Sequence, residues 1–428
     1  MADQKLTVLF LPESAYGPTN NCIGIGDILL KRGHRVVFAA ESSWKGRLAP
    51  LGFEEALVDL TPPSEDGGEQ DAGQFWKDYI TQISPEFRKS TTEQLETVTR
   101  PILEELIAGV EYAEPQLKRI IDEVRPDVVV EDNVVLFPAL ATAGVPFVRI
   151  VSCNPLEVPG KAVPPAFSGL SSGDHEAAAA FRAEYERTHG ELWARFDEYV
   201  QAQGAPALPH MEFMPEADVN LYLFPEVADY VDRRPLGEKW HRLDSSVRRV
   251  DAEARVPDHI ASGGGSLVYF SLGSLGSADV ELMREVIGVL ADTPHRYIVS
   301  KGPRHDEIEL PGNMWGAEFL PQTTILPLVD LVITHGGNNT VTESLHFGKP
   351  MVVLPLFWDQ YDNAQRVHEI GLGERLDTYR FTPEELRTAM ESLLGNASLR
   401  RNLTEIGEEI RSREGVTRAA DLIESAAR

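Results

Sequence analysis

The chain has 428 residues, which is too long for one compact core and favours two domains, because single domains mostly hold about 100–200 residues. Its 40 basic and 67 acidic side chains give a net charge of −27, and such a negative field repels nucleic acids and anionic membrane surfaces alike. The two cysteines, Cys22 and Cys153, are too few for a disulfide framework and are expected to be small buried thiols.

The first apolar run ends at Pro12, so it has the length of a strand and not that of a signal sequence. No apolar stretch reaches the roughly 18 residues that a membrane-spanning helix needs. We therefore expect a cytoplasmic protein with neither a membrane nor a nucleic acid as partner.

The first part of the chain predicts half of a doubly wound α/β protein. Short β-branched apolar runs alternate with longer segments of helical spacing, which is typical of a parallel sheet covered by helices on both faces. These runs cover residues 6–12, 34–40, 126–132 and 146–152.

An insertion interrupts this alternation between residues 154 and 215. It is rich in proline at both ends and carries an Ala/Glu-rich run with helical spacing between them, so we expect loops and helices there. Its aromatic side chains either pack the core or line a cleft, and core packing is the more ordinary role. They are Phe167, Phe181, Tyr185, Trp193 and Phe196.

A second alternation of strands and helices follows, with apolar runs at residues 266–274, 296–302, 330–337 and 350–357. We predict two Rossmann-like domains with doubly wound parallel sheets that face a shared cleft, because ligands of such sheets lie at the carboxyl ends of the strands. One amphipathic helix is expected over residues 398–428, with its end, about 410–428, packing back on the N-terminal domain. The expected bounds are 1–240 for the N-terminal domain, 241–265 for a linker and 266–409 for the C-terminal domain.

The most specific segment is VITHGGNNTVTESLHFGKP, residues 332–350, in which a strand runs through a Gly-rich turn into a helix. Gly336 and Gly337 let a bulky anion approach the backbone, and the amides and macrodipole of the first helical turn favour negative charge there. The segment therefore predicts a phosphate seat. Side-chain donors could come from His335, Asn339 and Thr340.

Glu343, one turn into this helix, is placed to accept hydrogen bonds from vicinal hydroxyls, as an acidic residue does for a ribose. The ordinary alternative is a Gly-rich turn in which Asn339 or Thr340 only caps the helix. Asp359 and Gln360 weaken that alternative, because they follow the next strand and should lie on the same cleft, where a carboxylate beside an amide can hold sugar hydroxyls.

Residues 318–367 resemble the nucleotide-sugar signature of family 1 glycosyltransferases, the UDP-glycosyltransferases of plants, animals and bacteria. The resemblance covers nearly fifty residues in matching order and spacing, and residues 32–38 and 126–132 resemble N-terminal landmarks of the same family. It implies the GT-B fold, in which the N-terminal domain binds the acceptor and the C-terminal domain binds the nucleotide sugar.

By this resemblance, Phe319 stacks on uracil where many members have tryptophan, and Gln322 lies near the base and ribose. Glu343 is the implied ribose contact. Asp359 and Gln360 are the implied hexose contacts and favour glucose-type sugars, so UDP-glucose or a related nucleotide sugar is the expected partner. Asn338 stands where plant members have tryptophan, and its role on the donor side is open. The implied diphosphate contacts, beside the backbone of Gly337, are Ser274, His335, Asn339 and Thr340.

The implied reaction is direct inverting transfer, in which an acceptor hydroxyl attacks the anomeric carbon while UDP leaves. Preorganised donors and a helix N-terminus can stabilise the departing diphosphate, and no metal-ligand spacing is evident, so we expect no metal and no cofactor. The acceptor hydroxyl must also lose its proton, and an alcohol needs a positioned base, most often histidine.

The usual base is missing from the acceptor-side loop. In this family it is the histidine of a GHxNP-like turn after the first strand, held by an aspartate after a later strand. Here Gly17 takes the place of the family's glycine and Asn20 that of its asparagine, but Pro18 stands at the histidine position. The partner aspartate is present as Asp132.

Three interpretations follow. In the first, Asp132 deprotonates the acceptor directly or through water, and acidic phenols would need little help. In the second, another side chain takes the proton, with Glu13, Tyr16 or a histidine of the insertion as candidates. In the third, the chain is an auxiliary protein that binds nucleotide sugars without transferring them. The intact donor residues favour an enzyme.

A NAD-binding oxidoreductase is a weaker alternative, since GIGDI at residues 24–28 matches only part of a dinucleotide fingerprint. For the acceptor we expect an apolar, planar or phenolic small molecule. Its pocket is expected to come from the insertion and residues 65–87, with Phe75, Trp76 and Phe87 as apolar lining.

Overall fold

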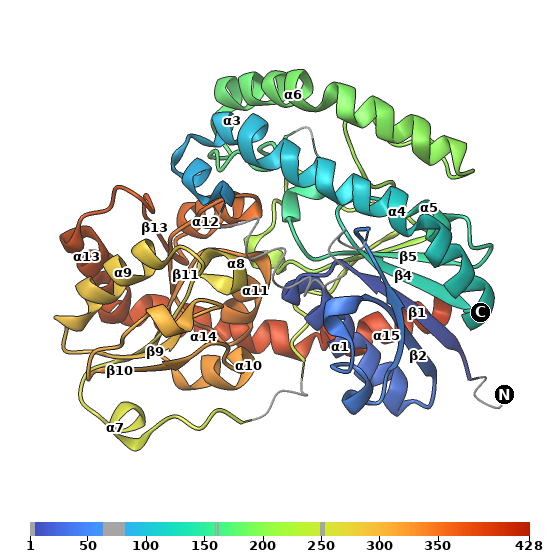
Figure 1. Ribbon diagram of the computed structural model, residues 1–428. Helices are drawn as coiled ribbons and strands as arrows, with labels where there is room; N and C mark the ends of the chain where they lie inside the picture. The colour runs from blue at the N-terminus through green and yellow to red at the C-terminus, as the bar shows by residue number, and fades with distance from the viewer. Residues whose placement is uncertain (1–4, 63–81, 159, 161, 249–252) are drawn as a thin grey trace.

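The computed structural model describes residues 5–62, 82–158, 160, 162–248 and 253–428. Two lobes lie side by side, each built on a parallel sheet with helices on its faces (Figure 1). The predicted α/β architecture with two doubly wound domains is confirmed.

The N-terminal sheet has seven strands in the order β3-β2-β1-β4-β5-β6-β7, and all of its pairs are parallel. The chain order reverses between β1 and β4, where Pro12 pairs with Asp132. This switch point opens a crevice at the carboxyl ends of the two strands. The strands are β1 (Thr7–Pro12), β2 (Arg35–Glu41), β3 (Glu54–Val58), β4 (Val128–Asp132), β5 (Phe147–Val151), β6 (Val219–Tyr222) and β7 (Trp240–Arg242).

The C-terminal sheet has six strands in the order β10-β9-β8-β11-β12-β13, again all parallel. Its switch point lies between β8 and β11, where Ser271 pairs with Thr334. The two switch points face one another across the interface between the lobes. The strands are β8 (Leu267–Ser271), β9 (Arg296–Ser300), β10 (Met314–Ala317), β11 (Leu331–Thr334), β12 (Met351–Val353) and β13 (Gly373–Arg375).

Helices cover the faces of both sheets. In the N-terminal lobe the long helices α4 and α6 lie across the top of Figure 1 and pack on one another. The helices of this lobe are α1 (Tyr16–Lys31), α3 (Thr91–Gln94), α4 (Arg100–Val124), α5 (Pro138–Ala141) and α6 (His175–Ala202). Those of the C-terminal lobe are α8 (Gly273–Gly276), α9 (Val280–Ala291), α10 (Gln322–Ile325), α11 (Asn338–His346), α12 (Asp359–Glu369) and α13 (Pro383–Gly395).

The end of the chain differs from the single helix predicted over residues 398–428. Two helices, α14 (Ala397–Ser412) and α15 (Gly415–Ala426), are separated at Glu414, whose φ is 46°. A left-handed residue cannot continue a right-handed helix, so the chain turns there. α14 packs on α11, whereas α15 crosses to the N-terminal lobe and packs on α1 (Figure 1). The last helix therefore joins the two lobes.

The insertion consists of loops around α6, as expected, and Phe181 and Phe196 are buried in the core. The segment predicted as a linker holds the end of β7 and the short helix α7 (Asp258–Ala261). No helix in the described part of the chain is long and apolar enough to cross a membrane.

Candidate active site

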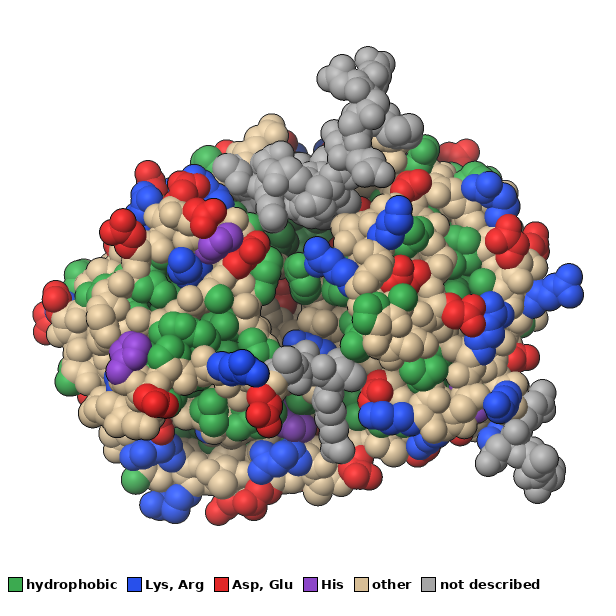
Figure 2. All heavy atoms as spheres, turned by 60° about the horizontal axis from the view of Figure 1, so that its bottom comes forward, with side chains coloured by type: hydrophobic (Ala, Val, Ile, Leu, Met, Phe, Trp, Pro, Cys, Tyr) green, Lys and Arg blue, Asp and Glu red, His purple; other side chains and the backbone are tan. Residues whose placement is uncertain are grey.

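A cavity of about 630 Å³ lies between the lobes, at the carboxyl ends of both sheets. Figure 2 shows a hollow between the two halves of the molecule, with hydrophobic side chains on its sides. The predicted donor contacts, the predicted catalytic residue and the predicted acceptor-side loop all line this cavity, although they come from different domains. They are Gly17, Pro18, Asp132, Ser274, Phe319, Gln322, His335, Gly337, Asn338, Asn339, Thr340, Glu343, Asp359 and Gln360.

The predicted phosphate seat is the N-terminus of α11. The helix begins at Asn338, directly after the N-cap Gly337, which has no side chain to cap it, and the Asp359 carboxylate accepts from the Asn338 backbone amide at 2.9 Å. Asn339 and Thr340 lie inside the helix, so neither is the ordinary N-cap of the alternative interpretation. Gly336 has a φ of 89°, and a Cβ there would lie 2.7 Å from Val353. Glycine is therefore required for the turn that aims the first amides of α11 at the cavity.

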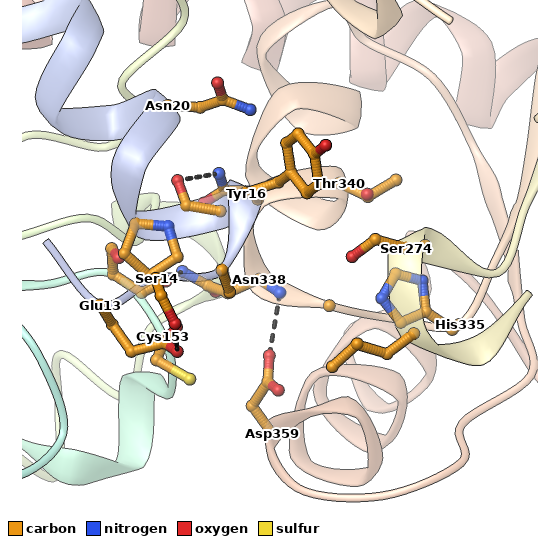
Figure 3. Close-up of a pocket in the computed structure, with 18 of the residues that line it drawn as sticks. Glu13, Ser14, Tyr16, Asn20, Cys153, Ser274, His335, Asn338, Thr340 and Asp359 are labelled. Atoms are coloured by element: carbon orange, nitrogen blue, oxygen red, sulfur yellow. Dashed lines mark hydrogen bonds between the residues drawn. The ribbon is translucent and has the colours of Figure 1, made fainter. Parts of the chain in front are cut away.

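His335 follows β11 and is fixed by two glycines. A Cβ on Gly273 would lie 2.6 Å from the imidazole ring, and one on Gly337 would lie 2.5 Å from it. Burial lowers the pKa of His335 to about 4, although a hydrogen bond to the Ser271 carbonyl opposes this shift. The imidazole is therefore neutral at pH 7 and held rigidly beside the start of α11, next to Ser274 (Figure 3).

Glu343 has partners for both carboxylate oxygens. Gln322 Nε2 donates to Oε2 at 2.6 Å, and Arg248 Nη1 lies 3.3 Å from Oε1. Gln322 Nε2 is also 3.4 Å from Thr340 Oγ1. Gln322, Glu343 and Thr340, which are predicted to contact the base, ribose and phosphate, thus form one connected group of polar side chains. Arg248 also belongs to this group, although the sequence did not suggest it.

Asp359 and Gln360 stand at the start of α12, after β12. Asp359 Oδ2 accepts from the Asn338 amide at 2.9 Å and from Asn363 Nδ2 at 3.0 Å, while burial raises the pKa of Asp359. Gln360 Oε1 accepts from the Leu356 amide at 3.0 Å. Both side chains are therefore held by backbone amides, and Asp359 also by the Asn363 side chain, before any sugar binds.

The side chains of Asn338 and Asn339 reach across the interface. Asn338 Nδ2 donates to the carbonyls of Ser152, at 2.7 Å, and Leu223, at 3.0 Å. Asn339 Nδ2 donates to the Gly17 carbonyl, and Asn339 Oδ1 accepts from Asn21 Nδ2, both at 2.9 Å. In this arrangement the two amides join the donor-side turn to the acceptor-side domain, which gives Asn338 the role that the sequence left open.

An aromatic contact spans the mouth of the cavity. The rings of Phe319 and Tyr16 lie 5.3 Å apart although they belong to different domains, and both are exposed, by 42% and 37%. Tyr16 also meets the edge of Trp44, and its hydroxyl accepts from Arg47 Nη1 at 2.8 Å. Phe319 thus presents an accessible face to the cavity entrance.

The acceptor side carries Pro18 within the first turn of α1, where its missing amide hydrogen costs nothing. Asp132 lies at the cavity wall but is only 2% exposed. The Ser152 hydroxyl is 2.8 Å from both Asp132 carboxylate oxygens, and burial raises the pKa of Asp132 well above its ordinary value.

The structure brings further residues into the cavity that the sequence did not single out. They include Glu41, Ser152, Cys153 and Glu157. Ser152 and Cys153 follow β5, so the rule that ligands lie at the carboxyl ends of strands could have found them. Cys153, expected to be a buried thiol, lines the cavity between the lobes (Figure 3), whereas Cys22 is buried.

Some predicted acceptor residues lie elsewhere. Phe87 does not line the cavity: it is 2% exposed and stacks on Phe357 with 4.6 Å between ring centroids, so the prediction of a pocket-lining role was wrong. Phe75 and Trp76 lie outside the described residues. None of the insertion's histidines, all in the described part of the chain, lines the cavity; they are His175, His189 and His210.

Two other features bear on the alternatives. Gly24 and Gly26 lie in the middle of α1, where a Cβ on Gly26 would be 3.1 Å from Phe53, so they serve packing and not a phosphate loop. Among the described residues, no group of three or more His, Cys, Asp or Glu is arranged to hold a metal ion.

Glu157 makes stability depend on pH. Burial raises its pKa to about 7 from the ordinary 4.5, against the opposing effect of Arg149. The folded state therefore holds this proton more tightly, so the resulting stability is present below about pH 4.5 and is lost as the pH rises through about 7. We expect the melting temperature of Glu157→Gln to fall less than that of the wild type as the pH rises over this range. An equal fall of the melting temperature in both proteins would contradict this.

Comparison with known proteins agrees with this geometry. Residues 251–411 match the family described as UDP-glucoronosyl and UDP-glucosyl transferase. Demethyllactenocin mycarosyltransferase of Streptomyces fradiae is 25% identical, and the alignment covers 97% of this chain and 86% of that protein.

Two solved structures share the fold over nearly the whole chain. The glycotransferase of kitacinnamycin has a TM-score of 0.74 and 23% identity, with 99% of this chain and 100% of that chain covered. The glycosyltransferase VinC, in complex with dTDP, has a TM-score of 0.66 and 18% identity, with 99% of each chain covered. Together with the family match of residues 251–411 and the cavity between two parallel-sheet domains, these findings confirm the resemblance to family 1 glycosyltransferases and the GT-B fold.

Proposed function

We propose that this protein transfers a hexose, of glucose type, from a UDP-sugar to a hydroxyl group of an apolar or phenolic small molecule, with inversion at the anomeric carbon. The observation that carries the proposal is the single cavity that gathers all predicted donor contacts from one domain and the acceptor loop from the other. Glu343 and Gln322 would hold the nucleoside, and Asp359 with Gln360 the sugar.

The leaving diphosphate would rest on the start of α11, beside His335, Thr340 and Ser274. The helix dipole and the amides of the first turn other than that of Asn338, which is bonded to Asp359, would stabilise negative charge there, so we propose that neither metal nor cofactor takes part. By family position Asp132 is one candidate for the proton acceptor; it lines the cavity, and its Oδ1 accepts from the Ser152 hydroxyl at 2.8 Å.

The comparisons widen the choice of substrates. A relative is named for mycarosyl transfer to demethyllactenocin, and a structural neighbour holds dTDP. We therefore include natural-product aglycones among the acceptors and TDP-sugars among the donors that compete with UDP-glucose.

The test is mass-spectrometric detection of glycosides from UDP-glucose and TDP-glucose with a panel of phenols, alcohols and macrolactones. The proposal expects a glycosylated product with UDP-glucose, and a preference for TDP-glucose would overturn the assignment of the nucleotide. Nucleotide binding without any product would instead support the auxiliary binding protein. Pro18→His is included, because a gain of alcohol acceptors would show that the loop retains the geometry for a histidine base.

Phe319 is expected to set donor affinity. Its exposed ring can exchange the contact with Tyr16 for a stack on the nucleobase, and such a stack contributes about 1–3 kcal/mol. Phe319→Ala should raise the KM for the nucleotide sugar by about tenfold with little change in kcat, whereas Phe319→Trp should keep the KM. An unchanged KM in Phe319→Ala would place the nucleobase elsewhere.

A further inference from the structure

We infer that Glu13 takes the proton from the acceptor hydroxyl, in the place of the missing histidine. The inference rests on the proposed glycosyl transfer and names the residue that completes it. The sequence offered Glu13 as one of several candidates for the base. The positions of the candidate side chains relative to the cavity distinguish Glu13 from the others.

The strand order places three carboxylates together. β2, β1 and β4 are neighbours in the sheet. Glu41 is the last residue of β2, Asp132 is the last residue of β4, and Glu13 directly follows β1. The Glu13 amide donates to the Asp132 carbonyl at 2.8 Å, so the backbone continues the pairing of the two strands by one residue. Glu13 thus stands in the middle of the acceptor-side wall, at the switch point of the sheet.

Glu13 differs from Asp132 in its access to the cavity. It is only half-buried and lines the cavity, whereas Asp132 is 2% exposed and both its oxygens face the Ser152 hydroxyl. A base must come within hydrogen-bond reach of the proton that it removes. Glu13 has that reach, while Asp132 acts behind Ser152 as a positioning residue.

The other candidates lack the position or the chemistry. The Tyr16 side chain is 37% exposed, and its hydroxyl already accepts a hydrogen bond from Arg47 Nη1 at 2.8 Å. The histidines of the insertion do not line the cavity. Figure 3 shows Glu13 and Asp359, the proposed sugar contact, extending from opposite domains toward the same space, where acceptor and sugar would meet.

The surroundings of Glu13 also give it suitable basicity. Burial raises its pKa to about 7, and the charge of Glu41 adds to this, while hydrogen bonds from the Ala15 amide and the Ser14 hydroxyl oppose it. A carboxylate with such a pKa is ionised in a large fraction of molecules at neutral pH and is a far stronger base than an ordinary glutamate.

The step balances without another reactant. The acceptor proton moves to a Glu13 carboxylate oxygen as the acceptor oxygen bonds to the anomeric carbon. The bond between that carbon and the phosphate oxygen breaks, and its electron pair leaves with the nucleoside diphosphate. Glu13 then returns the proton to water once the product has left.

The experiment compares kcat against pH for the wild type, Glu13→Gln and Asp132→Asn, with one alcohol and one acidic phenol as acceptors and nucleotide affinity by calorimetry as the control. Glu13→Gln should lower kcat for the alcohol by at least about 10²-fold, with the nucleotide affinity unchanged. It should also remove the acidic limb of the pH profile, which is the fall of kcat as the pH drops below about 7. The phenol should lose less, because it needs less help to ionise.

Glu41→Gln provides a readout that a structural role for Glu13 would not give. Removing the neighbouring charge should lower the pKa of Glu13 and move the acidic limb to lower pH. The inference is overturned if Glu13→Gln keeps the wild-type kcat and limb, or if only Asp132→Asn removes the limb. Absence of transfer by the wild type would overturn the proposed function as well, whereas transfer that survives in Glu13→Gln would overturn this inference alone.

Discussion

Replacing His335 by alanine is expected to lower kcat by about 10²-fold while the fold is kept. The imidazole stands beside the start of α11, where charge would gather on the leaving diphosphate, and it fills a slot between Gly273 and Gly337. Since the ring is neutral before the donor binds, it can gain a proton, and with it a second N–H donor, when the diphosphate arrives.

Gly273→Ala is the matched variant for this prediction. Its Cβ would meet the imidazole at 2.6 Å, so it should displace the ring and lower kcat although His335 is still present. Steady-state kinetics with the best donor, together with melting temperatures, checks both variants. Full activity in His335→Ala would remove this residue from the stabilisation of the leaving group.

Asp362→Ala is expected to reduce the free energy of unfolding by about 3 kcal/mol. The Asp362 carboxylate projects from α12 and accepts three hydrogen bonds from the other domain. Asn154 Nδ2 donates at 2.9 Å, the Phe167 amide at 2.6 Å and the Gly169 amide at 2.8 Å. Alanine would leave these donors without their acceptor in a buried interface, which costs more than the hydrogen bonds themselves contribute.

The same variant should lower kcat, because α12 also begins with Asp359 and Gln360 and would no longer be fixed against the acceptor domain. Asp362→Asn keeps one acceptor oxygen and should lose about half as much stability. Urea denaturation measures both changes. Equal stabilities for wild type and Asp362→Ala would show that other contacts between the lobes hold the interface.

The sequence predicted the central strands of both sheets because they are buried on both faces and read as continuous apolar runs. It did not predict edge strands such as β3, with the sequence EEALV, and β13, with the sequence GER. The apolar run of β3 is only residues 56–58 and β13 has none, so both segments become strands by pairing with β2 and β12. Tertiary contacts decide such elements, so local pattern could not reveal them.

The donor side of the cavity was predictable because residues 318–367 contain most of its lining in one continuous segment. The acceptor side was less predictable because it is assembled from distant parts of the chain. Glu13, Ser152 and Glu157 meet there only through the strand order. The bridging role of Asn338 depends likewise on carbonyls of the other domain, which no spacing in its own segment indicates.

The central claim is that the sugar is transferred by a single displacement in the cavity between the lobes. The stereochemistry of the product tests this claim most directly. Proton NMR of the glycoside formed from a nucleotide sugar with an α-linked hexose reports the new anomeric configuration. The account predicts the β-glycoside, formed with release of one nucleoside diphosphate for each glycoside. An α-glycoside would contradict it, because retention requires two displacements or a front-face attack.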